Sequence, residues 1–187
     1  PESRNLTKEE YKKLVLTAKS QGQGRLSLIL ETICATGIRV SELKELTVAG
    51  VKRGTVGIYC KGKSRQVLIP VALQKKLLYY VGKNGIRKGL VFQTAGGRPI
   101  DRSNIWKQMK ALCKQAKVKE EKVFPHNLRH LFAKSFYQIE KDIAKLADML
   151  GHSNIETTRI YIKTTCYEHR RQLEHMGLVL KVIGDTT

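Results

Sequence analysis

The sequence predicts a mostly α-helical fold with a small antiparallel β-sheet. Helix-capping patterns precede several runs in which apolar residues recur at helical spacing, and short β-branched runs occur within residues 54–70. Neither an internal repeat nor a low-complexity tract interrupts these patterns. Hydrophobic residues make up 41% of the 187-residue chain, which is enough for one domain to bury a core.

The first two helices are predicted from a cap and two glycine stops. Thr7 and Glu10 form a capping-box pattern ahead of apolar residues, so a helix begins there, and the glycine-rich segment 20–24 ends it. Residues 25–36 are mainly apolar and predict a buried second helix, which ends at Gly37.

A β-hairpin is predicted next. After a short third helix over 40–46, the runs 54–60 and 65–70 are short and β-branched, and the sequence Lys-Gly-Lys-Ser joins them. We therefore expect two antiparallel strands with a basic tip.

The second half of the chain returns to helical patterns. Pro125 suits the first position of a helix, Gly151 suits the residue after one, and Ser153 with Glu156 forms another capping-box pattern. The expected elements are helices over 71–81 and 103–116, a short strand over 90–93, and helices over 125–137, 140–150, from 153 onward, and 166–176.

The chain is strongly basic. It has 35 Lys plus Arg against 16 Asp plus Glu, a formal net charge of +19 and a pI of about 10.0. Nucleic acid is the favoured partner, because neutralising its phosphates releases counterions. The alternatives are simple solubility and an anionic membrane surface. The basic residues are spread along the whole chain and no amphipathic terminal helix concentrates them, which disfavours the membrane.

Several classes of protein are excluded. No apolar run approaches the ~20 residues that a membrane span needs, and the polar opening of the chain is no secretory signal. The cysteines are far apart and form no C-x-x-C pair, so we expect neither a zinc ribbon nor a disulfide scaffold, but reduced thiols in a cytoplasmic protein. The four cysteines are Cys34, Cys60, Cys113 and Cys166.

The segment 125–132, Pro-His-Asn-Leu-Arg-His-Leu-Phe, has two histidines at a spacing that suits either a metal or a phosphate. Asn127 stands where the H-E-x-x-H zinc-protease pattern has its glutamate base, and Arg129 adds a fixed positive charge, so we do not expect a metal. His126 and Arg129 share a face of the first helical turn, where free N–H groups and the helix dipole favour an anion. His130 is expected to serve packing.

Other candidate phosphate ligands occur along the chain. Arg39 follows a glycine turn at the start of a predicted helix, and Glu42 can orient Arg39 or a neighbour. His152 stands just before a capped helix, and Tyr161 follows nine residues later. The predicted hairpin tip adds Lys61, Lys63 and Arg65.

Five short sequence motifs, or boxes, follow one another along the chain: T-G-I-R-V-S-E-L, K-G-K, H-N-L-R-H, L-G-H-S and T-T-x-x-Y. Together they resemble the catalytic domain of the tyrosine recombinases, also called the phage integrase family, over nearly the whole chain. Each box is a weak signal, and the set of five is specific. The resemblance implies that residues 1–187 are a catalytic domain that cleaves and rejoins DNA through a 3′-phosphotyrosyl intermediate. It implies no metal or other cofactor.

The resemblance also implies residue roles. Arg39 and Arg129 match the two arginines that hold the scissile phosphate, Lys61 matches the hairpin lysine that serves as general acid, and Tyr161 matches the nucleophile. The histidines match positions that complete the phosphate site and assist proton transfer. The implied catalytic set is Arg39, Lys61, His126, Arg129, His152 and Tyr161, supported by Glu42, and we expect Lys63 and Arg65 to contact DNA.

Four alternatives stay open. Lys63 can reach the same leaving oxygen as Lys61. As straight helix, the nine residues between His152 and Tyr161 span roughly 12–14 Å, so the tyrosine packs back across the site or is swung in, from the same chain or a neighbouring protomer. The same chemistry also suits a type IB topoisomerase-like enzyme, and the same fold suits a DNA-binding module without catalysis.

The resemblance extends to partners. It implies double-stranded DNA and, for a full-length protein from a mobile element, a tetramer on paired DNA sites. Full-length members carry an N-terminal core-binding domain, which the six residues before Thr7 cannot supply. We therefore expect this chain to be a monomeric fragment that binds DNA weakly and recombines poorly alone, without a membrane partner.

Overall fold

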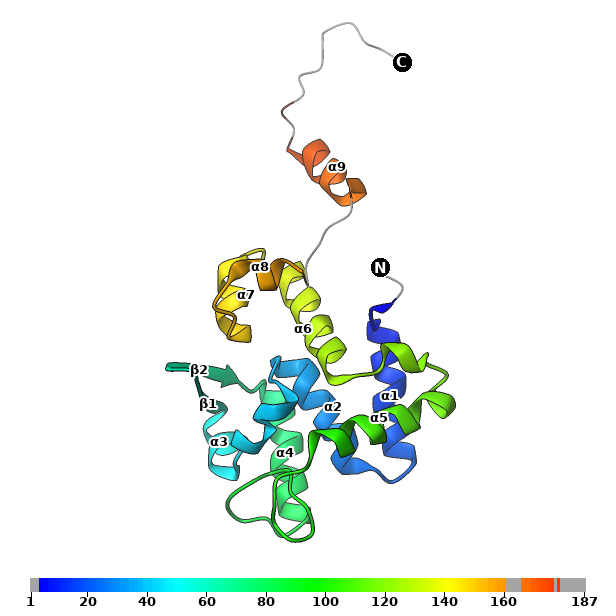
Figure 1. Cartoon of the computed structure of the whole chain (residues 1–187), viewed down its shortest axis with the longest axis vertical. Helices are drawn as coiled ribbons and strands as arrows, with labels where there is room; N and C mark the ends of the chain where they lie inside the picture. The colour runs from blue at the N-terminus through cyan, green and yellow to red at the C-terminus, as the bar shows by residue number, and fades with distance from the viewer. Residues whose placement is uncertain (1–3, 161–165, 177, 179–187) are drawn as a thin grey trace, which may run out of the picture.

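Helix α2 (Gly24–Thr36) runs through the centre of the fold, and four other helices pack around it. The computed structural model describes residues 4–160, 166–176 and 178 (Figure 1). Eight of the 13 residues of α2 are buried, because it is apolar on most of its surface. Its neighbours are α1 (Lys8–Ser20), α4 (Val71–Lys83), α5 (Arg102–Ala116) and α6 (Pro125–Ile139).

The predicted signals at both ends of the first helices are confirmed. Thr7 is the N-cap of α1, and its Oγ1 accepts a hydrogen bond from the backbone N–H of Glu10 at 3.1 Å. Gly37 ends α2 in the left-handed region with φ +71°. A Cβ at Gly37 would lie 2.7 Å from the Phe132 ring, so this position needs glycine for its conformation and for the approach of α6.

The third predicted helix is a 3₁₀ helix, η2 (Val40–Glu45), and a short helix that the sequence did not predict follows it. This helix, α3 (Val48–Arg53), is capped by Thr47, whose Oγ1 accepts from the N–H of Gly50 at 3.1 Å. Six residues are too few to display a helical period, which is why it was missed.

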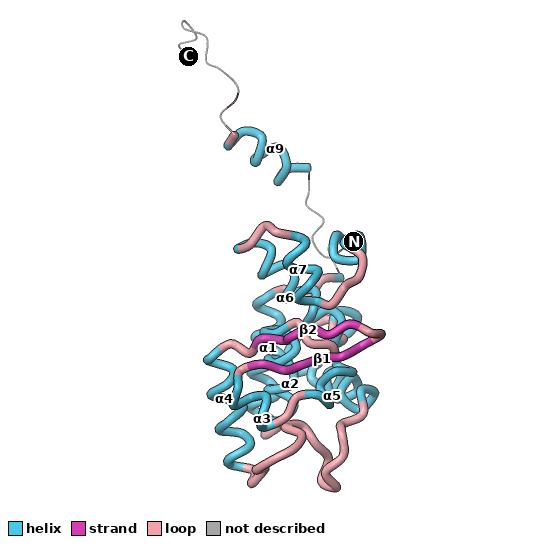
Figure 2. Tube along the Cα trace, turned by 90° about the vertical axis from the view of Figure 1, so that its left-hand side faces the viewer, coloured by secondary structure: helices cyan, strands magenta, loops and turns pink. Residues whose placement is uncertain are grey.

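The predicted hairpin is confirmed, with a shorter turn than expected. Strands β1 (Thr55–Cys60) and β2 (Lys63–Leu68) are antiparallel, and Cys60 pairs with Lys63. The turn is therefore only Lys61 and Gly62, both with positive φ (51° and 74°), as in the type I′ turns that match the twist of paired strands. Figure 2 shows the hairpin as a ribbon along one side of the helical body.

The predicted strand over 90–93 is wrong. Leu90 and Gln93 form only isolated bridges, with Thr47 and Pro99. The apolar residues Val91 and Phe92 are buried in the core, so their hydrophobicity serves the packing of a loop and not a sheet.

The C-terminal helices carry the second set of candidate residues. Pro125 begins α6 as predicted, and α7 (Ile143–Leu150) is capped by Asp142 and ends at Gly151. Helix α8 (Ile155–Arg159) is capped by Asn154 and not by Ser153, because the Asn154 Oδ1 accepts from the N–H of Glu156 at 2.9 Å. Helix α9 (Cys166–His175) stands apart from the body (Figure 1).

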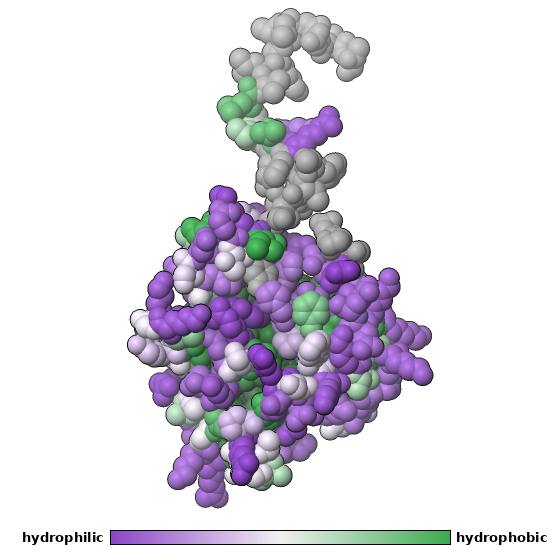
Figure 3. Space-filling view, viewed as in Figure 1, coloured by the Kyte–Doolittle hydropathy of each residue, from purple (hydrophilic) through white to green (hydrophobic). Residues whose placement is uncertain are grey.

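A small second core holds α7 against α6. Ala133, Leu146 and Leu150 are buried, and Phe132 and Phe136 pack against them. This core fixes the end of α7, where the chain turns toward His152. Hydrophilic side chains cover most of the face of the body seen in Figure 3. Among the described residues, no helix is both long and apolar enough to span a membrane.

Candidate active site

A cleft of about 850 Å³ opens between η2, the hairpin and the loop that joins α7 to α8. These three elements are far apart in the sequence, and each contributes side chains that the sequence analysis singled out. The candidate residues that line the cleft are Arg39, Glu42, Lys61, Lys63, Arg65 and His152.

Arg39 and Glu42 lie at the start of η2. The backbone N–H of Arg39 donates to Glu42 Oε1 at 2.8 Å, and the Arg39 guanidinium lies 3.5 Å from Glu42 Oε2. The Arg39 side chain is about one-third exposed, whereas that of Glu42 is buried. Glu42 thus fixes the backbone of Arg39 while the guanidinium stays open to the cleft.

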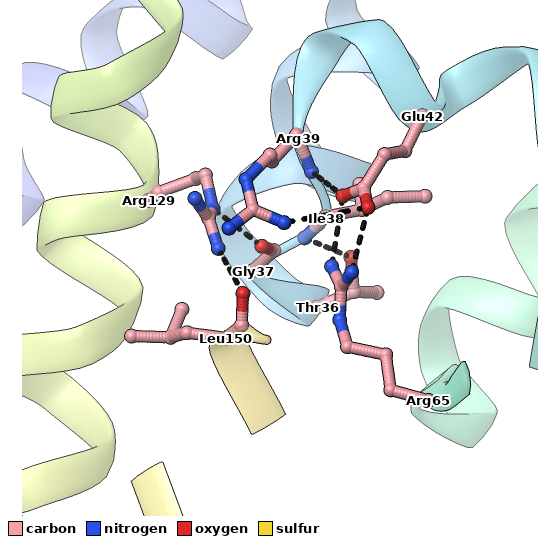
Figure 4. Close-up of polar contacts among 8 residues, drawn as sticks. All are labelled: Thr36, Gly37, Ile38, Arg39, Glu42, Arg65, Arg129 and Leu150. Carbon is pink, nitrogen blue, oxygen red and sulfur yellow. Dashed lines mark hydrogen bonds and ion pairs between the residues drawn. The ribbon is translucent and has the colours of Figure 1, made fainter. Parts of the chain in front are cut away.

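The Glu42 carboxylate has a second and closer partner. Arg65 on β2 donates from Nη1 and Nη2 to its two oxygens, at 2.6 and 2.8 Å (Figure 4). Burial alone raises the pKa of Glu42, but the hydrogen bonds and charges of Arg65 and Arg39 outweigh it and hold the pKa below its usual value. The Arg65 guanidinium is therefore directed at a carboxylate and not into solvent.

Arg129 lies behind the cleft and is almost fully buried. Its Nε donates to the carbonyl of Gly37 at 2.7 Å, and its Nη2 donates to the carbonyl of Leu150 at 2.8 Å (Figure 4). Both carbonyls are at helix C-termini, where partial negative charge favours a guanidinium. Arg129 therefore ties the ends of α2 and α7 together at the site.

His126 lies in the first turn of α6, one turn before His130. Partial burial, and then the positive charge of Arg129, lower the pKa of His126, with smaller effects from His130 and Arg39. His126 remains exposed to solvent despite this partial burial, and His130 is half-buried. His126 therefore lies within the electrostatic influence of Arg129 and Arg39.

His152 follows the glycine that ends α7. Its Nδ1 lies 2.9 Å from Oγ1 of Thr158, a fully buried residue of α8. Burial, and then the charges of Arg129 and Arg39, lower the pKa of His152 to about 4. The ring is therefore neutral near pH 7 and held in orientation by Thr158.

Lys61 and Lys63 are both exposed at the tip of the hairpin and line the same cleft. Lys61 occupies the first position of the two-residue turn, with φ +51°. A non-glycine residue in this region is uncommon and carries a modest conformational cost. The choice between the two lysines stays a prediction.

Tyr161 lies outside the described residues, as does the rest of 161–165. In the part of the chain that the structure describes, no three His, Cys, Asp or Glu side chains are grouped as metal ligands.

Three contacts of the candidate site residues were not predicted. Thr158 belongs to the T-T-x-x-Y box, but its bond to His152 could not be inferred from spacing alone. The carbonyls of Gly37 and Leu150 were missed because every residue has a backbone carbonyl, so the sequence does not show which carbonyls accept hydrogen bonds.

The collected groups suit a phosphodiester. Arg39 and His152 line the cleft together with the exposed Lys61 and Lys63. Arg129 and Arg39 act electrostatically on both histidines, and His126 lies in the first turn of α6, at its positive end. Fixed positive charge in a partly dehydrated cleft stabilises the negative charge that develops on a phosphate under attack.

The fold is that of the tyrosine recombinases. The crystal structure of XerA recombinase superposes with a TM-score of 0.77 at 26% identity, covering 94% of this chain and 64% of that chain. A DNA-bound integrase of the Tn1549 transposon has the same fold, with a TM-score of 0.75 at 15% identity, covering 94% of this chain and 66% of that chain.

Sequence comparison identifies the family of the chain. A family model described as the phage integrase family matches residues 4–167, and the chain belongs to that family. Tyrosine recombinase XerD of Halalkalibacterium halodurans is 34% identical over 173 residues, 86% of this chain and 57% of its own length. Tyrosine recombinase XerA of Pyrococcus furiosus is 29% identical over 193 residues, 97% of this chain and 64% of its own length. The chain thus spans less than two thirds of these relatives.

Proposed function

We propose that this chain is the catalytic domain of a site-specific DNA recombinase that cleaves and rejoins DNA strands through Tyr161. The observation that carries the proposal is the convergence of Arg39, Lys61 and His152, from three distant segments, on one cleft. Membership of the phage integrase family and the tyrosine recombinase relatives support it.

The proposed reaction begins with attack of the Tyr161 hydroxyl on the scissile phosphorus. A 3′-phosphotyrosyl bond forms and the bond to the 5′ oxygen breaks, so the bond energy is kept for rejoining. Arg39 and Arg129 stabilise the charge on the non-bridging oxygens. No step of this scheme calls for a metal ion.

Proton transfer is assigned to the remaining residues. Lys61, or Lys63 beside it, protonates the 5′ oxygen as it leaves. His152 is neutral near pH 7 because its pKa is about 4, so its ring accepts the proton that the Tyr161 hydroxyl loses as it attacks. His126 completes the phosphate site at the N-terminus of α6.

The partner in this proposal is double-stranded DNA, and the whole protein acts as a tetramer on paired sites. The net charge of +19 supports the first part. A lambda integrase of the same fold was crystallised as a tetramer on a Holliday junction, with a TM-score of 0.67 at 20% identity. A topoisomerase-like activity would use the same chemistry, and relaxation of supercoils without joining of two sites would identify it.

A nicked suicide DNA tests the proposal. Cleavage of such a substrate releases a short fragment, so the covalent protein–DNA adduct accumulates and is seen on a denaturing gel. We expect an adduct with the wild-type chain and none with Tyr161→Phe, because only Tyr161 supplies the nucleophile. Tyr167→Phe is the matched control and should form the adduct normally. An adduct that survives Tyr161→Phe would refute the assignment.

A further inference from the structure

Arg65 differs from the two lysines of the hairpin tip. Its side chain is 12% exposed, whereas Lys61 and Lys63 are exposed. Both of its terminal nitrogens donate to Glu42, at 2.6 and 2.8 Å. Its Nε is also enclosed, without an acceptor among the residues that the structure describes. A guanidinium whose terminal nitrogens are bonded in this way is poorly placed to contact a DNA phosphate.

Arg65 also packs on the chain just before His152. A Cβ added at Gly151 would lie 2.9 Å from Cδ of Arg65 and 3.0 Å from its Nε and Nη1. These distances are closer than ordinary packing, so the arginine lies flat against a residue that has no side chain. Three elements therefore meet at Arg65: β2, which carries it, η2 with Glu42, and the end of α7.

The contact with Glu42 leads on to Arg39. Glu42 Oε1 accepts from Arg65 and also from the backbone N–H of Arg39 at 2.8 Å. Figure 4 shows that both Arg65 and Arg39 contact the Glu42 carboxylate. Without Arg65, this buried carboxylate would lose its closest cation and its fixed orientation.

We propose that Arg65 is a positioning residue of DNA cleavage, which acts through Glu42 on Arg39. Its packing on Gly151 holds the guanidinium beside Glu42. The inference rests on the proposed function, since it needs a cleavage reaction to serve. It replaces the expectation that Arg65 contacts DNA.

Single-turnover cleavage at saturating suicide DNA separates positioning from binding. We expect Arg65→Gln to lower the cleavage rate about 10- to 100-fold, the size of effect that a misplaced reacting group produces. Its DNA dissociation constant should stay within about twofold of that of Arg87→Gln, a control that removes an exposed arginine of a loop. Weakened binding with an unchanged rate would instead make Arg65 a DNA contact and overturn the inference.

Arg65→Lys is the second variant. It keeps the charge but not the planar fork that bonds both oxygens of Glu42. If Arg65 positions the carboxylate, the lysine variant cleaves nearly as slowly as Arg65→Gln. If charge toward DNA is what counts, the lysine restores the rate, and the inference fails. Because the lysine keeps a positive charge near Glu42, the buried carboxylate does not lose its counter-charge, and we expect this variant to fold.

A double-mutant cycle tests the route through Glu42. We expect Glu42→Gln and the double variant with Arg65→Gln to cleave at rates within about threefold of each other, because the second change removes nothing further. Rate losses that multiply would show that Arg65 acts by another route and would overturn the inference.

The two proposals fail in different ways. A wild-type chain that forms no adduct with suicide DNA refutes the proposed function. A wild-type chain that forms the adduct, with Arg65→Gln as fast as wild type, refutes only the positioning role.

Discussion

Arg129 and His152 illustrate how single residues are adapted to this site. Arg129 is 5% exposed, and a buried guanidinium is costly unless its hydrogen bonds are satisfied. Two helix C-terminal carbonyls accept from it, so its position is set by the backbone of two helices. His152 is kept neutral by burial and by the same positive charges that would attract a phosphate.

The low pKa of His152 predicts a pH dependence of stability. The pKa is about 4 in the folded chain against an ordinary value of 6.5. At pH values between these two, the unfolded chain therefore binds the proton more readily than the folded chain. Folding stability should therefore fall as the pH drops from 6.5 toward 4. Replacing His152 with Asn removes this contribution, so we expect the thermal midpoint of His152→Asn to fall less steeply over this window. Parallel profiles for the two chains would contradict the lowered pKa.

At the scale of elements, close packing of α2, α6 and α7 places the arginines. The chain leaves α2 at Gly37, beside the Phe132 ring of α6 and the Leu150 side chain of α7. The carbonyl of Gly37 accepts from Arg129, and Arg39, two residues later, is the N-cap of η2. A small change at this junction should therefore disturb both arginines.

Gly37→Ala tests this junction against a matched glycine. Gly37 and Gly22 both have φ +71°, so alanine bears a similar conformational cost at each. Alanine at Gly22 meets nothing within 4 Å, whereas at Gly37 it would lie 2.7 Å from Phe132. We expect Gly37→Ala to lose about 1–3 kcal/mol more unfolding free energy than Gly22→Ala, the usual cost of overpacking. Urea unfolding measures the difference, and equal losses would show that α6 yields to the added methyl group.

For the whole molecule, charge is the dominant property. The excess of 35 basic over 16 acidic residues gives +19, and most described lysines are exposed. Such a surface binds DNA largely through phosphates, with an affinity that falls as salt rises. In the proposed function, the cleft acts on a DNA backbone that this charge attracts.

Salt titration tests the role of the whole surface. We expect the dissociation constant for duplex DNA, measured by fluorescence anisotropy, to be weaker than nanomolar at physiological salt and to rise linearly with salt on logarithmic axes. Lys63→Gln should reduce the slope by about 0.9, the share of one phosphate contact, and Arg65→Gln should leave it unchanged. An affinity that does not depend on salt would contradict a phosphate-dominated interface.

Much of the fold could be predicted, with instructive exceptions. Helix ends at Thr7, Gly37 and Gly151 were found because caps and stops depend on the nearest few residues. The apolar run at 90–93 was taken for a strand, since burial in a loop and burial in a sheet select the same residue types. The short α3 offered no period to detect.

The sequence by itself determined most of the local elements and, through five ordered boxes, the residue types of the candidate site. Only the tertiary structure decided how those residues are used. It turns Arg65 onto a carboxylate 23 positions away, and it sets Arg129 on a carbonyl 92 positions away. The reason is physical: caps and turns depend on neighbours along the chain, whereas the partner of a long, flexible side chain depends on which distant segments pack beside it.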